Sequence, residues 1–197
     1  FDIRRDSEEL FSNLDIMNDS VLCQQWMNQW PVIFLSMKDI DGLSYQKAYE
    51  QFVLQISELY KRYTYVLECE AIDPDDKEIF SLLKAGQASE AQISRSLSTL
   101  MRMLQTYYQK QVILLLDEYD VPIAKANAGG YYRQMLDMMK GLMQALKDNC
   151  ALKFAVVTGC LKIAKESIFT GTNNFVSDSV ADSRLTEYFG FVQREVD

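Results

Sequence analysis

The chain has 197 residues, 48% of them hydrophobic, with a net charge of −8 and a pI of about 4.7. These values are typical of one α/β domain, or slightly more than one, with a sizeable core. The negative charge argues against a broad nucleic-acid-binding surface, and no apolar run approaches the length of a membrane span. The absence of histidine excludes Ser-His-Asp and Cys-His catalysis. Four cysteines without a CxxC pair indicate reduced thiols, so we expect a cytoplasmic protein.

The first third of the chain predicts a helix, a buried strand and a long amphipathic helix. Val21–Trp30 is expected to be helical and to end before Pro31. The apolar run Val32–Met37 (VIFLSM) predicts a strand. Over Leu43–Tyr65, apolar and aromatic residues recur at three- and four-residue steps, which is typical of a helix with one side facing the core.

Two further helices are predicted before the next strand. Asp73 precedes a proline and two more acids, which is the pattern of a capped helix start, and this helix is expected to stop near Gly86. Ser89 and Gln92 have the spacing of a capping box that begins the following helix. The residues of that helix expected to face the core are Ile93, Leu97, Leu100, Met101 and Leu104.

The stretch QVILLLDEYDVPI places three acids directly after an apolar run. Val112–Leu116 predicts a buried parallel strand, and Asp117, Glu118 and Asp120 follow it. Functional groups of α/β proteins gather at this end of the strands. An apolar strand ending in Asp-Glu resembles the Walker B motif, in which the aspartate holds Mg²⁺ and the glutamate polarises the attacking water. The alternative is an ordinary buried strand that ends in solvated acids.

The last third of the chain predicts a connector, a helix and a third strand. Residues 124–130 (AKANAGG) are expected to form a connecting loop, and Tyr131–Asn149 a helix whose methionines lie in the core. Leu152–Val157 is an apolar strand that ends at Thr158. Because long crossovers separate the three strands, we predict a parallel sheet with Thr158 at the same edge as the acids.

Seven segments, in this order, resemble the prokaryotic AAA-ATPase-like family, whose members commonly carry a PD-(D/E)XK nuclease-like domain after the ATPase module. The segments are PVIFLSMKDIDG, LLLDEYDVPI, GGYY, LKDN, LKFAVVTG, KIAKESIFTGTNN and EYFGF. The resemblance covers essentially the whole chain. It implies a P-loop NTPase-like, AAA-type, three-layer α/β/α fold that lacks its first strand. In the strand order of that fold, the QVILLLDEYD strand would lie in the middle of the three predicted strands. It also implies a partial ATPase domain over residues 1–184 and the start of a helical lid over residues 185–197.

The resemblance also implies roles for five residues, with ATP and Mg²⁺ as cofactors. Asp117 would hold Mg²⁺, Glu118 would activate water, and Asp120 would be a supporting acid near the cofactor. Thr158 would sense the γ-phosphate. Lys162 stands where family members usually have an arginine, and lysine cannot make the forked contact with phosphate that arginine makes.

The phosphate-binding loop of such ATPases is not found in this sequence. No segment has the G-x-x-x-x-G-K-[ST] pattern, and Gly129-Gly130 is not followed by lysine. In the family this loop lies just before the residue that matches Phe1. We therefore expect a fragment of an ATPase, or a gene remnant, that is inactive by itself and does not bind ATP. Phe1–Ile3, which is expected to end an upstream element, favours the fragment.

Two alternatives from other functional classes stay open. One is a non-catalytic interaction or regulatory module that kept the ATPase fold, and the other is a metal-dependent nuclease that uses Asp117, Glu118 and Asp120.

The missing first strand would leave the third strand unpaired on one side, and exposed edges recruit partners. We expect another chain, an upstream segment or residues after Asn174 to cover that edge. The isolated segment is expected to self-associate or to be marginally stable.

Overall fold

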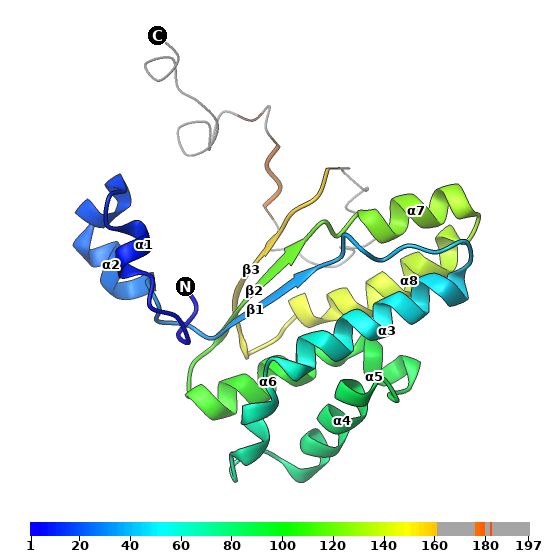
Figure 1. Ribbon diagram of the computed structural model, residues 1–197, viewed down its shortest axis with the longest axis horizontal. Coiled ribbons are helices and arrows are strands. Elements are labelled where there is room, and N and C mark those ends of the chain that lie inside the picture. The colour runs from blue at the N-terminus through cyan, green and yellow to red at the C-terminus, as the bar shows by residue number, and fades with distance from the viewer. Residues whose placement is uncertain (161–175, 180–181, 183–197) are drawn as a thin grey trace.

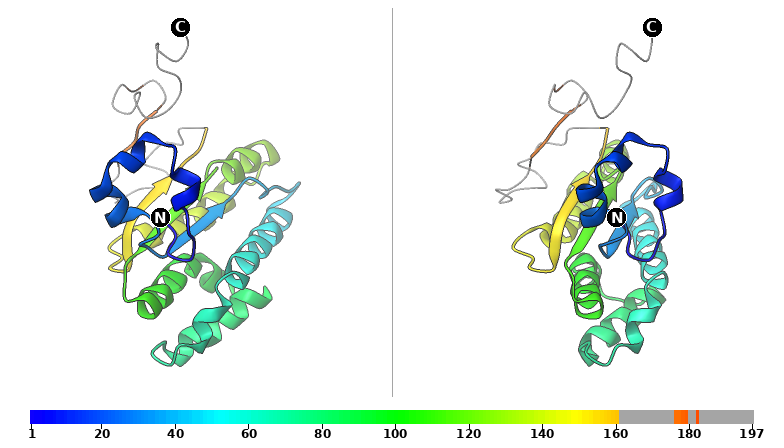
Figure 2. Two further views of the ribbon diagram at one scale, coloured as in Figure 1. Left: turned by 60° about the vertical axis from the view of Figure 1, so that its left-hand side comes forward. Right: turned by 90° about the vertical axis from the view of Figure 1, so that its left-hand side faces the viewer.

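The computed structural model describes residues 1–160, 176–179 and 182 (Figure 1). Helices alternate with three strands along the chain, and most of the helical mass lies to one side of the strands (Figures 1 and 2). The elements are α1 (Glu8–Phe11), η1 (Asp15–Asn18), α2 (Ser20–Trp26), β1 (Val32–Ser36), α3 (Tyr45–Lys61), η2 (Thr64–Glu68), α4 (Pro74–Ala85), α5 (Glu90–Ser94), α6 (Ser96–Tyr108), β2 (Val112–Asp117), α7 (Val121–Gly129), α8 (Tyr132–Met143), η3 (Gln144–Leu146) and β3 (Leu152–Val157).

The three strands form one parallel sheet in the order β1-β2-β3. This confirms the prediction of a parallel sheet with the DEYD strand in the middle. In the register of the sheet, Phe34 lies beside Leu115, and Leu115 lies beside Val156. Side chains alternate between the two faces of a strand, so these three residues share one face and their sequence neighbours share the other.

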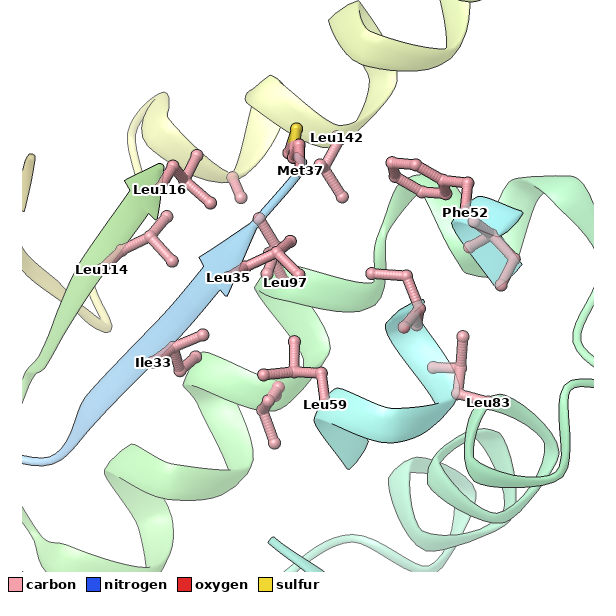
Figure 3. Packing of buried hydrophobic residues seen from close by; sticks show 14 of the residues in the cluster. Ile33, Leu35, Met37, Phe52, Leu59, Leu83, Leu97, Leu114, Leu116 and Leu142 are labelled. Carbon is pink, nitrogen blue, oxygen red and sulfur yellow. The ribbon is translucent and has the colours of Figure 1, made fainter. Parts of the chain in front are cut away.

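One face of the sheet holds the core. Leu35 of β1 and Leu114 of β2 are 3% and 0% exposed, and both point toward helices α3, α6 and α8 (Figure 3). Leu59, Leu97 and Leu142 of those helices are also at most 1% exposed. Each such side chain contributes roughly 1.5–3 kcal/mol by leaving water, so this face determines how the helices pack.

The opposite face is covered at its amino end and open toward its carboxyl end. Phe1 and Trp26 pack edge-on against Phe154, with ring centroids 5.9 Å and 5.6 Å away. Farther along, Phe34 is 47% exposed and Val156 is 44% exposed. Phe34, partly buried Leu115 and Val156 form an apolar row across the sheet, here called the open-face row, which the described helices leave uncovered.

The two edges of the sheet differ in the hydrogen-bond partners of their backbone groups. At the outer edge of β1, the Tyr63 hydroxyl donates to the Val32 carbonyl at 2.6 Å, and the Gln55 amide donates to the Ser36 carbonyl at 3.0 Å. These side chains satisfy edge carbonyls that would otherwise pair with another strand. Within the described residues, β3 pairs with β2 alone. Of the residues after Asn174, the described ones (176–179 and 182) are in no strand.

Predicted helix starts and stops are confirmed where capping side chains determine them. Asp73 accepts a hydrogen bond from the Asp75 amide, and Gly86 ends α4 in the left-handed conformation with φ +70°. The capping box of Ser89 and Gln92 begins α5. The single helix predicted after it is two helices, because the chain departs from helical geometry at Arg95.

Two of the predicted helix ends in the first third of the chain are too late. Helix α2 stops at Trp26 rather than Trp30, because Asn28 adopts the left-handed backbone conformation with φ +55°. The side-chain amide of Asn28 donates to the Asp2 carbonyl and to the Ser7 hydroxyl. Helix α3 stops at Lys61, and the chain then forms the short 3₁₀ helix η2. In both places local hydrogen bonds end the helix before the apolar pattern does.

The prediction of a loop over residues 124–130 is wrong. These residues belong largely to helix α7, which begins at Val121 and ends at Gly129. Pro122 in the first turn favours a helix start, alanine has the highest helix propensity, and Gly130 with φ +79° terminates the helix. In the methionine-rich helix α8, Met135, Met138, Met139 and Met143 are buried, as predicted. This helix ends at Met143 and is followed by η3, so the predicted end at Asn149 is too late.

All four cysteines are free in the structure. In the part of the chain that the structure describes, no helix combines the length with the apolar character that crossing a membrane requires.

A buried serine in α6 gives a first stability prediction. Ser96 is 0% exposed, and no hydrogen-bond partner lies near its hydroxyl in the described structure. Ser96→Ala is expected to raise the free energy of unfolding by about 1 kcal/mol, because it removes a desolvated, unpaired hydroxyl. Urea unfolding followed by circular dichroism measures the change.

Ser57→Ala is the matched control for this substitution. Ser57 is also buried, but its hydroxyl donates to the Lys84 carbonyl at 2.6 Å. Its loss is expected to lower the free energy of unfolding by about 1 kcal/mol. A Ser96→Ala variant that is destabilised as much as Ser57→Ala would contradict the prediction.

Candidate functional site

The ends of all three strands bring polar side chains to one edge of the sheet. Asp117 is the last residue of β2, it lies in register beside Ser36 of β1, and Thr158 directly follows β3. The Thr158 hydroxyl donates a hydrogen bond of 2.5 Å to a carboxylate oxygen of Asp117. Backbone bonds hold these groups in place, because the Thr158 amide donates to the Leu116 carbonyl and the Tyr119 amide to the Thr158 carbonyl. The structure thus places Thr158 and Asp117 together, as the sequence predicts.

Glu118 occupies a strained position immediately after the strand. Its φ is +53°, in the left-handed region that a side chain with a Cβ rarely adopts. The Val121 amide donates to its carbonyl at 3.2 Å, so the chain turns here from β2 into α7. Backbone strain of this kind clusters at functional sites, where the surrounding structure enforces it. The strained residue is the one to which the sequence assigns water activation.

Asp120 lies deeper than its two companions. It is 3% exposed and precedes α7, where its carbonyl accepts hydrogen bonds from the amides of Ile123 and Ala124. Gly159, just after Thr158, packs closely against Asp120. A Cβ at Gly159 would lie 2.5 Å from a carboxylate oxygen of Asp120 and 2.8 Å from the Tyr119 ring. The close packing of residues 159 and 119–120 joins the two strand ends that carry the site.

Gly159→Ala is expected to destabilise the fold by roughly 1–3 kcal/mol, because the added methyl group overpacks a tight contact. The clash is with the side chains of Asp120 and Tyr119, so these buried side chains must shift. Thermal unfolding of the variant and of the unaltered chain measures the loss. An unchanged melting temperature would show that the contact is looser than the structure has it.

A depression beside Asp117 extends past the outer edge of β1. Its volume is about 450 Å³. The lining includes Asp117 and Ser36, the cations Lys38 and Arg62, and the acids Asp39 and Glu58 together with Phe34, Leu35, Gln55 and Leu59. This polar space opens next to the carboxylate that the sequence assigns to Mg²⁺.

The groups at this edge fit a magnesium ion held partly by other ligands. Mg²⁺ binds oxygen atoms and commonly takes one or two carboxylates, with waters and substrate phosphates completing the shell. Asp117 supplies a carboxylate, and Ser36 and Thr158 supply hydroxyl oxygens on either side. Over residues 1–160, 176–179 and 182, no cluster of three or more acids, cysteines or histidines could hold a metal by itself.

Three cations bear on the candidate chemistry. Lys125, which follows the acids in sequence, pairs with Asp41 at 3.2 Å, and this hydrogen bond lowers the pKa of the Asp41 carboxyl. Lys38 lines the depression beside Asp117 and was not singled out in the sequence. Lys162 lies outside the described residues.

Sequence reasoning also missed Ser36 and Gly159. A single serine at the end of an apolar strand belongs to no motif, and the glycine shows its role only through its neighbours. The one available signal for Ser36 was strand alternation, which gives it and Phe34 the same face.

Comparisons with known proteins identify the family of this chain. The sequence profile of the family described as "Predicted AAA-ATPase" matches residues 1–169. A protein of Azotobacter chroococcum mcd 1, described as an uncharacterized protein in the vnfD 5' region, is 34% identical over 90 residues. That match covers 45% of this chain and 17% of the relative, so the chain spans a small part of that protein's length. No solved structure matches the chain. Because the profile covers most of its length, the chain belongs to the AAA-ATPase-like family.

Proposed function

We propose that this chain supplies the metal-binding and water-activating residues of a Mg²⁺-dependent ATPase, and that the phosphate-binding loop lies outside these 197 residues. The observation that carries the proposal is the hydrogen bond from Thr158 to Asp117 at the carboxyl edge of the sheet, next to Glu118. Family membership supports nucleotide and Mg²⁺ use in general. We call the proposed protein that joins this chain to such a loop the complete ATPase.

The residues of this chain would have two roles, which are to hold the metal and to activate the attacking water. When bound, Mg²⁺ would neutralise charge on the phosphates. Asp117 would hold the metal, and the hydrogen bond from Thr158 would fix the orientation of its carboxylate. Glu118 would accept the proton of the attacking water. Lys162 is proposed to contact the phosphates as a point charge rather than as a fork.

Thr158→Val in the complete ATPase tests this arrangement. The substitution keeps the shape of the side chain and removes the hydroxyl that orients Asp117. Mg²⁺-dependent ATP hydrolysis is expected to fall roughly 10–100-fold, as with other residues that orient a metal ligand. Steady-state phosphate release measures the effect, and Thr158→Ser, which keeps the hydroxyl, is expected to stay near wild-type activity.

The same assay separates the proposal from the non-catalytic alternative. ATP binding without hydrolysis in the complete ATPase would favour a regulatory module over an enzyme. Equal turnover of Thr158→Val and Thr158→Ser would remove Thr158 from the site. The 197-residue chain alone is expected to show no measurable ATP binding, since the main phosphate contacts lie elsewhere.

A further inference from the structure

We propose that Ser36 is a further positioning residue of this site, whose hydroxyl holds a water molecule of the Mg²⁺ shell beside Asp117. The inference rests on the proposed function, because it concerns the same metal. It names a residue on β1, a strand to which neither the sequence motifs nor the family resemblance assigns any part of the site.

The register of the sheet places Ser36 beside Asp117. Ser36 ends β1 and pairs directly with Asp117 at the end of β2. Alternation puts both side chains on the face that carries the open-face row. Thr158 follows Val157, which pairs with Leu116, so it occupies the same level on the third strand. Three oxygen-bearing side chains therefore form a polar row across the sheet, with neighbouring strands about 4.8 Å apart.

The hydroxyl of Ser36 has no partner within the described part of the protein. Its oxygen is buried and makes no hydrogen bond, although the Ser36 backbone carbonyl accepts one from Gln55. Thr158, on the other side of Asp117, does use its hydroxyl. A buried polar atom without a partner is rare in native proteins, and an ordered water or ion is a common reason for one.

The surroundings of Ser36 distinguish it from the second unpaired serine, Ser96. Ser36 lines the depression of about 450 Å³ together with Asp117 and Lys38, and that volume has room for several waters. Ser96 is 0% exposed, and it does not line this depression. The proposal requires the Ser36 hydroxyl to turn toward the depression by rotation about χ1, whose staggered positions are the ones a serine populates.

A serine hydroxyl suits a water in the shell of a hard cation. Mg²⁺ keeps several of its waters when it binds to proteins, and those waters need acceptors for their hydrogens. A hydroxyl accepts one such hydrogen bond and can donate its own hydrogen to the neighbouring carboxylate. Ser36 would then restrain the metal from the β1 side, opposite Thr158, and residues in this position tune metal affinity.

Mn²⁺ binding to the complete ATPase in the presence of ATP tests the inference without relying on turnover. Free Mn²⁺ is measured by electron paramagnetic resonance during a titration. Ser36→Ala is expected to weaken Mn²⁺ binding about tenfold. Ser36→Thr, which keeps a hydroxyl, and Ser96→Ala, which removes the other unpaired hydroxyl, are expected to stay near the wild-type value.

Two controls, Asp117→Asn and thermal unfolding of the metal-free proteins, separate the role of Ser36 from the proposed function and from a role in folding. If Asp117→Asn leaves Mn²⁺ affinity unchanged, the proposed function fails and the inference fails with it. If Asp117→Asn weakens binding but Ser36→Ala behaves like Ser96→Ala, the role of Ser36 alone is overturned. Thermal unfolding of the metal-free proteins gives the second readout: both alanine variants should be as stable as wild type or more stable. A clear loss of stability in Ser36→Ala would show that its hydroxyl serves the fold.

Discussion

Glu118→Gln in the complete ATPase is expected to reduce ATP hydrolysis by a factor of about 10²–10⁴, the usual contribution of a general base, while ATP binding stays near the wild-type level. Glutamine has nearly the shape of glutamate, so the strained backbone with φ +53° is unchanged. The amide cannot accept the proton of the attacking water. Phosphate release under saturating ATP gives the turnover, and equilibrium binding of a fluorescent ATP analogue gives the affinity.

Glu78→Gln is the matched control for this loss of charge. Glu78 is an exposed acid on helix α4, away from the strand ends. Its neutralisation is expected to leave turnover and binding unchanged. Equal turnover of Glu118→Gln and Glu78→Gln would remove Glu118 as the base, and loss of ATP binding in Glu118→Gln would indicate a structural role for the turn instead.

Self-association of the 197-residue chain is the second large effect that we expect. The open-face row presents Phe34 and Val156 at 47% and 44% exposure, and the outer edge of β3 has no strand partner within the described residues. An apolar surface beside an unpaired strand edge favours association with a second copy. Sedimentation velocity over a range of concentrations should show a weight-average mass that rises with concentration.

The double variant Phe34→Glu/Val156→Glu should abolish that rise. Both side chains are about half exposed, so charges there reach water and repel a second copy at little cost to the fold. Leu54→Glu is the control, because Leu54 is 58% exposed on α3 and lies outside the row. If the chain is monomeric at all concentrations, or if Leu54→Glu acts like the double variant, the open-face row is not the surface responsible.

The sequence alone determined the strands, their parallel direction and the capped helix starts. Each of these depends on local pattern: an apolar run such as Val112–Leu116 predicts a buried strand, and the long crossovers that parallel pairing needs separate the three strands. Asp73 and Gly86 mark the ends of α4 through hydrogen bonds that their own neighbours make. Where a local pattern had two readings, as in AKANAGG, the prediction of a loop was wrong, because a proline in the first turn and three alanines favour a helix.

The composition of the site was only partly visible in the sequence. Asp117 and Glu118 follow a strand that the sequence predicts, so their place at the carboxyl edge follows from topology alone. The hydrogen bond from Thr158 to Asp117 depends on the register between β2 and β3, which neither strand encodes by itself. The positions of Ser36 beside Asp117 and of Gly159 against Asp120 likewise appear only when residues distant in sequence pack together. Local hydrogen bonding and periodicity are properties of the sequence, whereas register and close packing are decided by the tertiary structure.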